Sequence, residues 1–493
     1  CIRDRYCGAI DPTDLDEYLR LGGFQALAQC LPPSTDNAPV KPGARIEPDA
    51  IIETIRDSGL RGRGGAGFPT ARKWEAVRDA EGERKFIVCN GDEGDPGAFM
   101  DRMILESYPF RVIEGMIIAS LAVGATEGLL YIRAEYPLAV TRVEEALRIC
   151  EEAGYLGENI SGSGHTFHLR TMLGAGAFVC GEETALLASV EGRRGTPTIR
   201  PPYPARRGLN GCPTLVNNTE TFALVPWIVR NGADRFAALG TPESKGTKVF
   251  SLAGKVERGG LIEVPMGTTL RQIIFELGGG IPGGREFKAV QTGGPSGGCI
   301  PAWKMDLPVD YEALAKEGSI MGSGGMIVLD ADTCVVDLAR YFLTFTQNES
   351  CGKCPPCRVG TRAMLAILTR IAEGKGEMSD LDTLETLAHT VKNASLCGLG
   401  QTAPNPVLTT LRNFRGEYEA HVHEGRCPAR QCRALVHYEI SAEKCVGCTM
   451  CAKNCPVSCI TGSHKEVHVI DQSLCIKCGR CFEVCRFNAV LKG

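Results

Sequence analysis

Two runs of four cysteines near the C-terminus constrain this chain more than any other feature of its sequence. Both runs have the spacing CxxCxxCxxxC: Cys445, Cys448, Cys451 and Cys455, then Cys475, Cys478, Cys481 and Cys485. A 4Fe-4S cluster needs four converging thiolates, and in paired runs of this spacing the fourth ligand of each cluster comes from the other run. We therefore expect one cluster on Cys445, Cys448, Cys451 and Cys485, and a second on Cys475, Cys478, Cys481 and Cys455.

Structural zinc is the alternative, because CxxC pairs also bind zinc. A zinc ion needs only four ligands, however, and two complete runs exceed that number. Pro456 follows Cys455 as the cluster motif requires, whereas Arg486 replaces the corresponding proline after Cys485. The spacing thus predicts a bacterial ferredoxin-like domain within residues 426–493.

Composition limits the remaining possibilities. A chain of 493 residues is too long for one core and should form three or four domains. The net charge of -4 gives no overall field that would attract nucleic acid or anionic lipid. Half of the 24 cysteines have cluster spacing, which indicates a reducing cytoplasm and not a secreted disulfide protein.

The ends of the chain and its most apolar segment give two further expectations. Segment 112–132 is interrupted by Glu114 and Glu127, so we expect a buried helix and no direct membrane span. The chain opens on Cys1 and not on methionine, which predicts a truncated or processed N-terminus.

Four regions differ in their pattern of apolar residues. Residues 1–240 alternate glycine-rich loops, short apolar runs and helix-like stretches, which predicts a Rossmann-like α/β domain with a parallel sheet. Short strands around one helix over 245–330 predict a β-grasp (ubiquitin-like) module. Four helical segments over 334–425 predict a four-helix bundle, and the ferredoxin-like domain with its linker follows at 426–493.

The bundle region contains a third candidate cluster site. SCGKCPPCRVGT at 350–361 gives Cys351, Cys354 and Cys357 the spacing CxxCxxC, and Cys397 in SLCGLG is the candidate fourth ligand. Three thiolates from one loop and one distant cysteine suit a 4Fe-4S cluster. The spacing alone leaves zinc with four cysteines as the alternative.

Three glycine-rich segments indicate a nucleotide or flavin site. They are GLRGRGGAGFPT at 59–70, NGDEGDPGAFMDR at 90–102 and GAGAFVCGEETALLASVEG at 174–192. Glycine lets backbone amides approach a phosphate or a flat ring, and a helix N-terminus favours negative charge. The first segment is not a GxGxxG after a strand, so a purely structural turn is nearly as good an explanation. Glu182 and Glu183 suit the start of a helix equally well.

These loops, together with LVNNTET at 215–221 and the cluster loop at 350–361, closely resemble the NADH-oxidising flavin subunit of respiratory complex I over about residues 45–425. Such subunits lack a ferredoxin tail. The combination resembles the flavin subunit of cytoplasmic NAD-linked FeFe-hydrogenases, including electron-bifurcating ones, and of related formate dehydrogenases. The family usually carries a thioredoxin-like 2Fe-2S domain. Only Cys1, Cys7 and Cys30 precede residue 45, which is too few for such a cluster, so we expect it on a small partner subunit.

The resemblance implies a set of cofactor-binding residues. For FMN these are Gly62, Gly64, Gly65, Gly67, Lys73, Asn90, Asp92, Gly181, Glu182, Asn217 and Asn218. For NAD they are Phe68, Glu93, Asp95, Phe178, Glu183, Arg200 and Tyr203. The family often has tyrosine in place of Phe178 and glutamate in place of Asp95. A carboxylate at Asp95 should repel the additional phosphate of NADP, which favours NAD.

The linker before the ferredoxin-like domain offers a zinc site. EAHVHEGRCPARQC at 419–432 contains residues that none of the three clusters needs, and Cys459 is also unassigned. The preferred ligands are His421, Cys427, Cys432 and Cys459, with His423 as the substitute, and the alternative is a linker with incidental thiols. The other cysteines, Cys334 among them, are expected to be buried thiols.

The sequence therefore predicts an enzyme subunit that exchanges hydride with NAD(H) through FMN and relays single electrons through three 4Fe-4S clusters. It has no hydrogenase or formate site of its own, so we expect a catalytic hydrogenase or formate dehydrogenase subunit and ferredoxin as partners. The alternatives are a passive electron-transfer scaffold and a respiratory NADH:quinone oxidoreductase subunit, which the ferredoxin tail disfavours.

Overall fold

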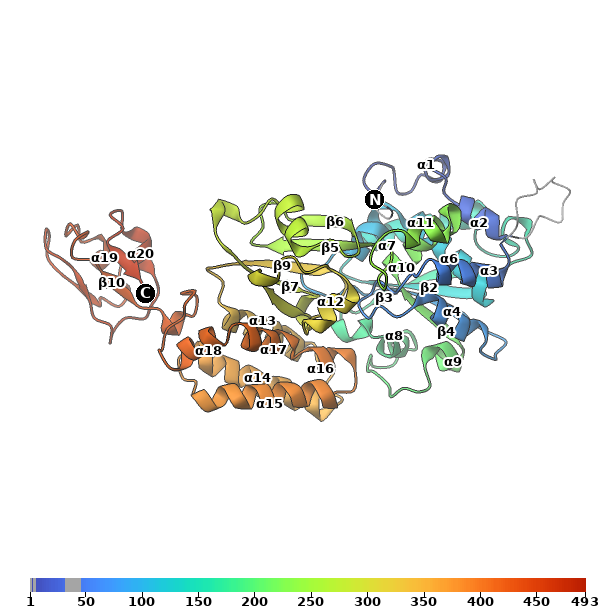
Figure 1. The fold of residues 1–493 in the computed structure, drawn as a ribbon. Coiled ribbons are helices and arrows are strands. Elements are labelled where there is room, and N and C mark those ends of the chain that lie inside the picture. Colours follow the sequence, from blue (N-terminus) through green and yellow to red (C-terminus); the bar gives the residue numbers. More distant parts are fainter. Residues whose placement is uncertain (1, 3–5, 32–45) are drawn as a thin grey trace.

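A computed structural model describes residue 2 and residues 6–31 and 46–493. Cys1, on which the prediction of a truncated N-terminus depends, lies outside the described residues. The described chain forms a large α/β body, a second sheet, a helical bundle and a small C-terminal domain (Figure 1).

A parallel sheet of order β3-β2-β1-β4 organises the N-terminal region. Its strands are β1 (Phe86–Gly91), β2 (Glu127–Arg133), β3 (His168–Gly174) and β4 (Thr214–Asn218). The larger helices around it are α3 (Pro48–Asp57), α4 (Thr70–Arg78), α5 (Met100–Ser107), α6 (Pro109–Val123), α7 (Pro137–Glu152), α8 (Glu183–Val190) and α10 (Thr219–Asn231). Shorter helices are α1 (Leu15–Arg20), α2 (Gln25–Cys30), α9 (Pro204–Arg207) and α11 (Ala233–Ala237).

Both faces of this sheet are buried, as a continuous apolar strand such as FIVC requires. Successive side chains of a strand point to opposite faces. Ile87 and Cys89 accordingly pack in the core that contains α6 and α10, whereas Phe86 and Val88 pack in the core that contains α8. Apolar packing on two sides therefore fixes the position of the loop that follows β1.

The apolar segment 112–132 is not one buried helix, so that prediction was wrong. Helix α6 ends at Val123, Gly124 adopts φ +74°, and β2 begins at Glu127. Glu114 is buried inside α6, where it accepts hydrogen bonds from the Tyr18 hydroxyl and the Leu27 amide. The glutamate therefore has hydrogen-bond donors within the protein interior, as a buried polar group requires.

The second sheet has the strand order β6-β5-β9-β7-β8. Its strands are β5 (Thr247–Gly254), β6 (Gly260–Pro265), β7 (Phe287–Thr292), β8 (Gly298–Pro301) and β9 (Gly325–Asp330). Only the central pair β5 and β9 is parallel among these pairings. A helical segment at Gln272–Leu277 and α12 (Tyr311–Lys316) pack on one face of the sheet. This order, with a helix between the second and third strands, is that of the predicted β-grasp module.

Four helices form the bundle predicted after this module: α13 (Val335–Asn348), α14 (Pro355–Ala372), α15 (Met378–Ala394) and α17 (Asn405–Asn413). Two short helices, α16 (Gly398–Thr402) and α18 (Arg415–Val422), complete it. The mixed α/β fold class with a parallel sheet is confirmed.

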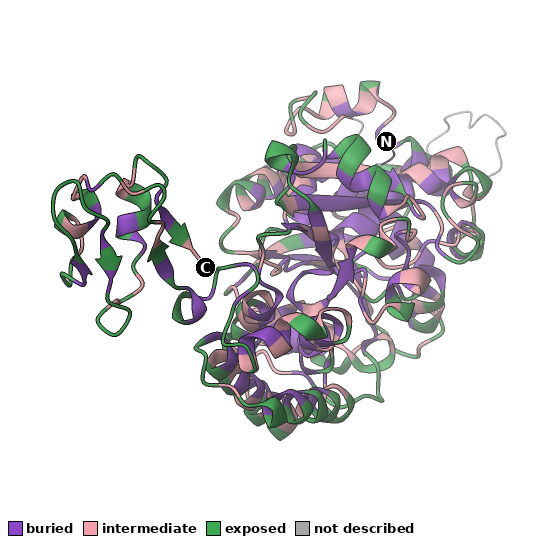
Figure 2. Ribbon diagram, turned by 60° about the vertical axis from the view of Figure 1, so that its left-hand side comes forward, coloured by how far each residue is buried: buried purple, intermediate pink, exposed green. Residues whose placement is uncertain are grey.

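The C-terminal domain is small and lies beyond α18, away from the first sheet (Figure 1). Strand β10 (Tyr438–Ile440) pairs with β13 (Val490–Lys492), and β11 (Ile460–Thr461) pairs with β12 (Val469–Ile470). Helices α19 (Met450–Lys453) and α20 (Arg480–Val484) carry cysteines inward. Figure 2 shows that much of this domain is exposed. Within the described residues, no helix has the length and apolar character needed to cross a bilayer.

Candidate functional site

The topology of the first sheet places the predicted flavin loops at one point. Strands β2 and β3 lie on one side of β1, and β4 lies on the other, so the strand order reverses between β1 and β4. Open α/β sheets bind ligands beyond the carboxyl ends of the strands at such a point. Asn90 lies near the end of β1, Asp92 directly follows β1, and Asn218 ends β4. These three predicted residues therefore belong to one crevice.

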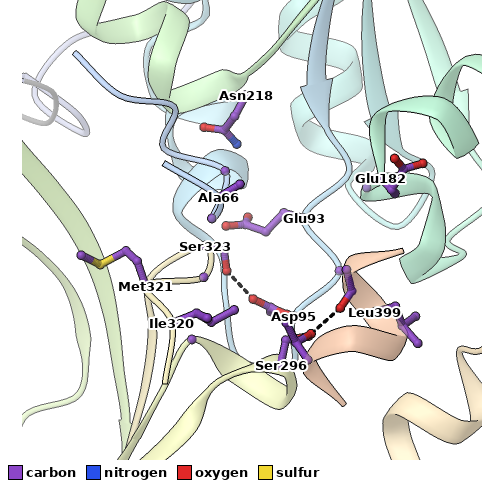
Figure 3. Close-up of a pocket in the computed structure, with 18 of the residues that line it drawn as sticks. Ala66, Glu93, Asp95, Glu182, Asn218, Ser296, Ile320, Met321, Ser323 and Leu399 are labelled. Atoms are coloured by element: carbon purple, nitrogen blue, oxygen red, sulfur yellow. Dashed lines mark hydrogen bonds between the residues drawn. The ribbon is translucent and has the colours of Figure 1, made fainter. Parts of the chain in front are cut away.

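A cavity of about 600 Å³ occupies this crevice, which is within the size range of cofactor sites. Ten of the predicted residues line it: Gly64, Gly65, Asn90, Asp92, Glu93, Asp95, Phe178, Gly181, Glu182 and Asn218. Figure 3 shows Glu93 and Asn218 from the first module, Met321 and Ser323 from the β-grasp module, and Leu399 from the bundle around one space. The cavity thus lies where three modules meet.

Gly65 shows why the first loop is rich in glycine. Its φ is +126°, and a Cβ there would lie 3.3 Å from the backbone carbon of Gly322 in the β-grasp module. A side chain would be strained in that conformation and would crowd the opposite wall of the cavity. The glycine allows the two loops to approach closely.

Two buried carboxyl groups of the cavity wall, Asp92 and Asp95, have raised pKa values. Both oxygens of Asp92, and Oδ1 of Asn217, have no hydrogen-bond partner among the described residues. Burial raises the pKa of Asp92 to about 7, although Arg133 opposes this shift. Burial also raises the pKa of Asp95 to about 6, against a hydrogen bond from Ser323. The oxygens of Asp92 can therefore accept hydrogen bonds from the hydroxyl groups of a cofactor such as FMN.

Three other cavity residues hold helix N-termini. Glu93 accepts hydrogen bonds from the Met100, Asp101 and Arg102 amides of α5. Glu182 accepts bonds from the first amides of α8, and Asn218 caps α10 through the Glu220 amide at 2.9 Å. The helix-start explanation applies to Glu182, which nevertheless lines the cavity. These contacts fix the positions of the polar side chains in the cavity wall.

Eight predicted residues do not line the cavity: Gly62, Gly67, Phe68, Lys73, Glu183, Arg200, Tyr203 and Asn217. Lys73 Nζ lies 3.1 Å from Glu183 Oε2, and Arg200 Nη1 lies 2.9 Å from Glu183 Oε1. Burial acts to raise the pKa of Glu183, but these two cations hold it below its ordinary value. Phe68 and Tyr203 are exposed.

The sequence did not identify the wall that the other two modules contribute. It consists mainly of Gly293, Ser296, Tyr311, Ile320, Met321, Gly322, Ser323, Gly398, Leu399 and Thr402. The glycine clusters GGPSGG at 293–298 and GSGG at 322–325 are the signal that could have identified part of it.

The four bundle cysteines gather at one end of the bundle. Cys351 lies in the loop before α14, Cys354 is the residue before its first turn and Cys357 is in that turn, whereas Cys397 precedes α16. Burial raises the pKa of Cys357 to about 11 against a hydrogen bond with Ser350, and the nearby Cys354, Cys397 and Cys351 add to the rise. Gly398 and Leu399, directly after Cys397, line the large cavity. This thiol group therefore adjoins the candidate flavin site.

The C-terminal domain contains two cysteine-lined cavities. One is bordered by Cys445, Cys448, Cys451 and Cys485. The other is bordered by Cys455, Cys475, Cys478 and Cys481. In each cavity three thiols come from one run and the fourth from the other, which is the donor set that a 4Fe-4S cluster requires.

The zinc ligand set requires a correction. The ligand atoms of Cys334, His421, Cys427 and Cys432 lie within 4.8 Å of one another and are buried. Cys459 is not in this group, because it lies in the ferredoxin-like domain beside Cys455, and His423 is not in it either. Cys334, expected to be an incidental buried thiol, takes the fourth place because the start of α13 packs against α18.

The environment of this group suits zinc. Three cysteines and one histidine are a common structural zinc set. His421 Nδ1 lies 2.6 Å from the carbonyl oxygen of Glu417, which orients the ring so that Nε2 faces the thiols.

Three family models match the chain. The Nuo51 FMN-binding domain matches residues 55–227, the NADH-ubiquinone oxidoreductase-F iron-sulfur binding region matches 337–421, and a 4Fe-4S binding domain matches 468–491. A crystal structure of an NAD+-reducing NiFe-hydrogenase in the H2-reduced state superposes with a TM-score of 0.70 and 40% identity, covering 76% of this chain and 63% of that chain.

Curated relatives extend the match to the whole chain. The NADP-reducing hydrogenase subunit HndC of Solidesulfovibrio fructosivorans is 52% identical and covers 100% of this chain and 97% of its own. The F 2 subunit of the NADH-quinone oxidoreductase of Rhizobium meliloti is 44% identical over 84% of this chain and 96% of its own. The alpha subunit of the NAD-reducing hydrogenase HoxS of Cupriavidus necator is 42% identical over 77% of this chain and 62% of its own length. The chain therefore belongs to the family of FMN-binding, iron-sulfur-containing subunits of NAD(P)-reducing hydrogenases and NADH-quinone oxidoreductases.

Proposed function

We propose that this chain exchanges hydride with NAD(H) at FMN and relays single electrons through three 4Fe-4S clusters to a hydrogenase partner and ferredoxin. The observation that carries the proposal is the cavity at the junction of the three modules, because its wall includes Gly398 and Leu399, next to the cluster cysteine Cys397. A cofactor in this cavity would be close to the first cluster site.

The protein's own residues provide binding and orientation. FMN, when bound, supplies the conversion between two-electron and one-electron transfer. The oxygens of Asp92, which accept no hydrogen bond among the described residues, would accept hydrogen bonds from it, and Gly64 and Gly65 would let it approach the loop backbone. Asn90 supports this arrangement, since its Nδ2 donates to the Gly181 carbonyl at 2.9 Å and its Oδ1 accepts from the Asp92 amide at 3.1 Å.

Donor sets support the metal assignments. Each of the three proposed 4Fe-4S sites has four cysteines. In the bundle, three have the spacing CxxCxxC and Cys397 is distant in sequence, and in the C-terminal domain each set of four borders its own cavity. The group of Cys334, His421, Cys427 and Cys432 is proposed to hold zinc and to fix the ferredoxin-like domain against the bundle.

The nicotinamide specificity is proposed to favour NAD(H). Asp95 lines the cavity, and its carboxylate would repel the additional phosphate of NADP(H). The names of the relatives refer to NADP for HndC and to NAD for HoxS. Asp95→Asn should raise the ratio of NADPH to NADH oxidation by about tenfold, equivalent to removing about 1.4 kcal/mol of repulsion. An unchanged ratio would exclude Asp95 as the discriminating residue.

The partner is proposed to be a catalytic hydrogenase subunit, with a small 2Fe-2S thioredoxin-like subunit beside it. HndC, a hydrogenase subunit by name, matches the full length of this chain, whereas the NADH-quinone relative matches 84%. This difference favours a hydrogenase over a quinone complex, and HoxS favours it over formate dehydrogenase. Electron bifurcation between NAD(H) and ferredoxin, and a cytoplasmic location, remain predictions from the sequence.

An anaerobic titration of the intact complex with NADH, and separately with NADPH, tests the proposal. Flavin bleaching followed by reduction of cluster signals is the expected result with NADH. If FMN is bound but neither nucleotide bleaches it, the hydride-exchange function is wrong, and a passive electron-transfer scaffold is the better description.

A further inference from the structure

One cluster cavity of the ferredoxin-like domain contains a fifth cysteine. Besides Cys455, Cys475, Cys478 and Cys481, the cavity is lined by Cys459, which is buried. Cys459 Sγ lies 3.4 Å from Cys455 Sγ. This is hydrogen-bond distance for two sulfur atoms, and it also places the additional thiol beside the position of a cluster ligand.

The internal repeat of the domain provides a comparison within the same chain. Cys455 and Cys485 end the two cysteine runs, and four residues later the chain has Cys459 in one repeat and Ala489 in the other. The Cys459 amide donates to Cys455 Sγ at 3.3 Å, and the Ala489 amide donates to Cys485 Sγ at 3.3 Å. The backbone amide four residues after the last cysteine therefore donates the same hydrogen bond to that cysteine's sulfur in both repeats. What differs at this position is the presence of the thiol.

A thiol in this place has two chemical consequences. It can donate an S–H hydrogen bond to the Cys455 thiolate, and hydrogen bonds to ligating sulfurs are among the factors that set the reduction potential of a cluster. Reduction adds negative charge to the cluster, so a donor at Cys455 favours the reduced form and raises the potential. The short distance between the sulfurs also means that Cys459 needs little movement to reach the iron that Cys455 would bind.

We propose that Cys459 is a fifth functional thiol of this cluster site, which donates a hydrogen bond to Cys455 and replaces it as ligand when Cys455 is lost. In that replacement the Cys459 thiol releases its proton to solvent and its sulfur forms the bond to iron, so no oxidant or reductant is consumed. The inference rests on the proposed function, because it requires that Cys455, Cys475, Cys478 and Cys481 hold a 4Fe-4S cluster.

The first test compares reduction potentials in the full-length chain. Redox titration followed by electron paramagnetic resonance should show that Cys459→Ala lowers the potential of one cluster. Cys459→Ser, which keeps a donor, should lower it less. Introducing the thiol in the other repeat, Ala489→Cys, should raise the potential of the other cluster. Unchanged potentials in Cys459→Ala would overturn the proposal.

The second test counts iron. Cys455→Ala should keep the wild-type iron content, whereas Cys455→Ala combined with Cys459→Ala should lose iron from one cluster. The matched control is Cys485→Ala, which should lose iron because Ala489 offers no replacement, and Ala489→Cys should restore it. Loss of iron in Cys455→Ala equal to that in the double variant would overturn the proposal. A wild-type chain without these clusters would instead contradict the cofactor assignment on which the proposal rests.

Discussion

Asp92 offers a direct test of the cavity as a flavin site, because the structure gives its carboxyl group no hydrogen-bond donor. The substitution Asp92→Asn keeps the size of the side chain and removes its charge. Two effects of opposite sign should follow. The variant without FMN should become more stable at high pH, and its affinity for FMN should fall.

The size of the stability effect follows from the shift in pKa. Burial raises the pKa of Asp92 from 3.8 to about 7. Between these pH values the folded chain holds a proton that the unfolded chain has released, so the free energy of unfolding falls as the pH rises. Three pKa units correspond to about 4 kcal/mol, present below pH 3.8 and lost once the pH exceeds about 7. Asp92→Asn should remove this loss.

Chemical denaturation of the FMN-free chain at pH 5 and pH 8 measures the effect. Fluorescence of the buried Trp74 in α4 reports on the same module. Hydrogen-bond donors of bound FMN would favour the ionised Asp92 carboxylate, so the affinity of the wild type for FMN should increase from pH 5 to pH 8. The affinity of Asp92→Asn for FMN should be weaker and should be the same at both pH values. Asp57→Asn, on the surface, is the matched control. Parallel loss of stability in wild type and Asp92→Asn would refute the reasoning.

Three further substitutions test other parts of the molecule. Metal analysis should show one zinc ion per chain fewer in Cys334→Ser than in wild type, and an unchanged zinc content in Cys459→Ser. The reverse result would favour the ligand set expected from the sequence. Cys397→Ala should slow reduction of the ferredoxin-like clusters after mixing with NADH in stopped-flow measurements, and an unchanged rate would exclude the bundle cluster from the path. Lys248→Met should lower the free energy of unfolding by about 3–5 kcal/mol, because it leaves Glu220 charged and buried. Adding Glu220→Gln should recover part of this loss, and no recovery would argue against the ion pair as the cause.

The sequence predicted those parts of the site whose residues lie close together along the chain. Such local motifs can be recognised without knowledge of the fold. They are the glycine-rich loops at 59–70 and 90–102 and the two cysteine runs, whose characteristic residues all lie within one short segment. Ser323 and Leu399 were missed because they reach the cavity only after the β-grasp module and the bundle pack against the first sheet.

Cys334 and Cys459 show the same limit for metal ligands. Cys334 is 87 residues from His421 and lies in an apolar run, which gave it the pattern of a core residue. Cys459 is four residues after a cluster cysteine, and spacing alone did not show that its side chain turns toward Cys455. Donor chemistry predicted a zinc site in the linker, but only the packing of α13 against α18 identified the fourth member of the candidate ligand group.

The position of the zinc group has a consequence for electron transfer. Cys334 and His421 lie at the bundle helices α13 and α18, whereas Cys427 and Cys432 lie in the linker to the ferredoxin-like domain. At the end of this linker, Arg433 Nη2 donates to the Ile476 carbonyl at 2.9 Å. In the proposed electron path, electrons from the bundle cluster would cross this region to reach the cysteine runs, because the linker lies between the bundle and the C-terminal domain (Figure 1). If the proposed zinc binds there, it would hold the distance and orientation between the proposed bundle cluster and the C-terminal clusters, whereas the proposed hydride exchange would depend on the cavity at the other end of the bundle.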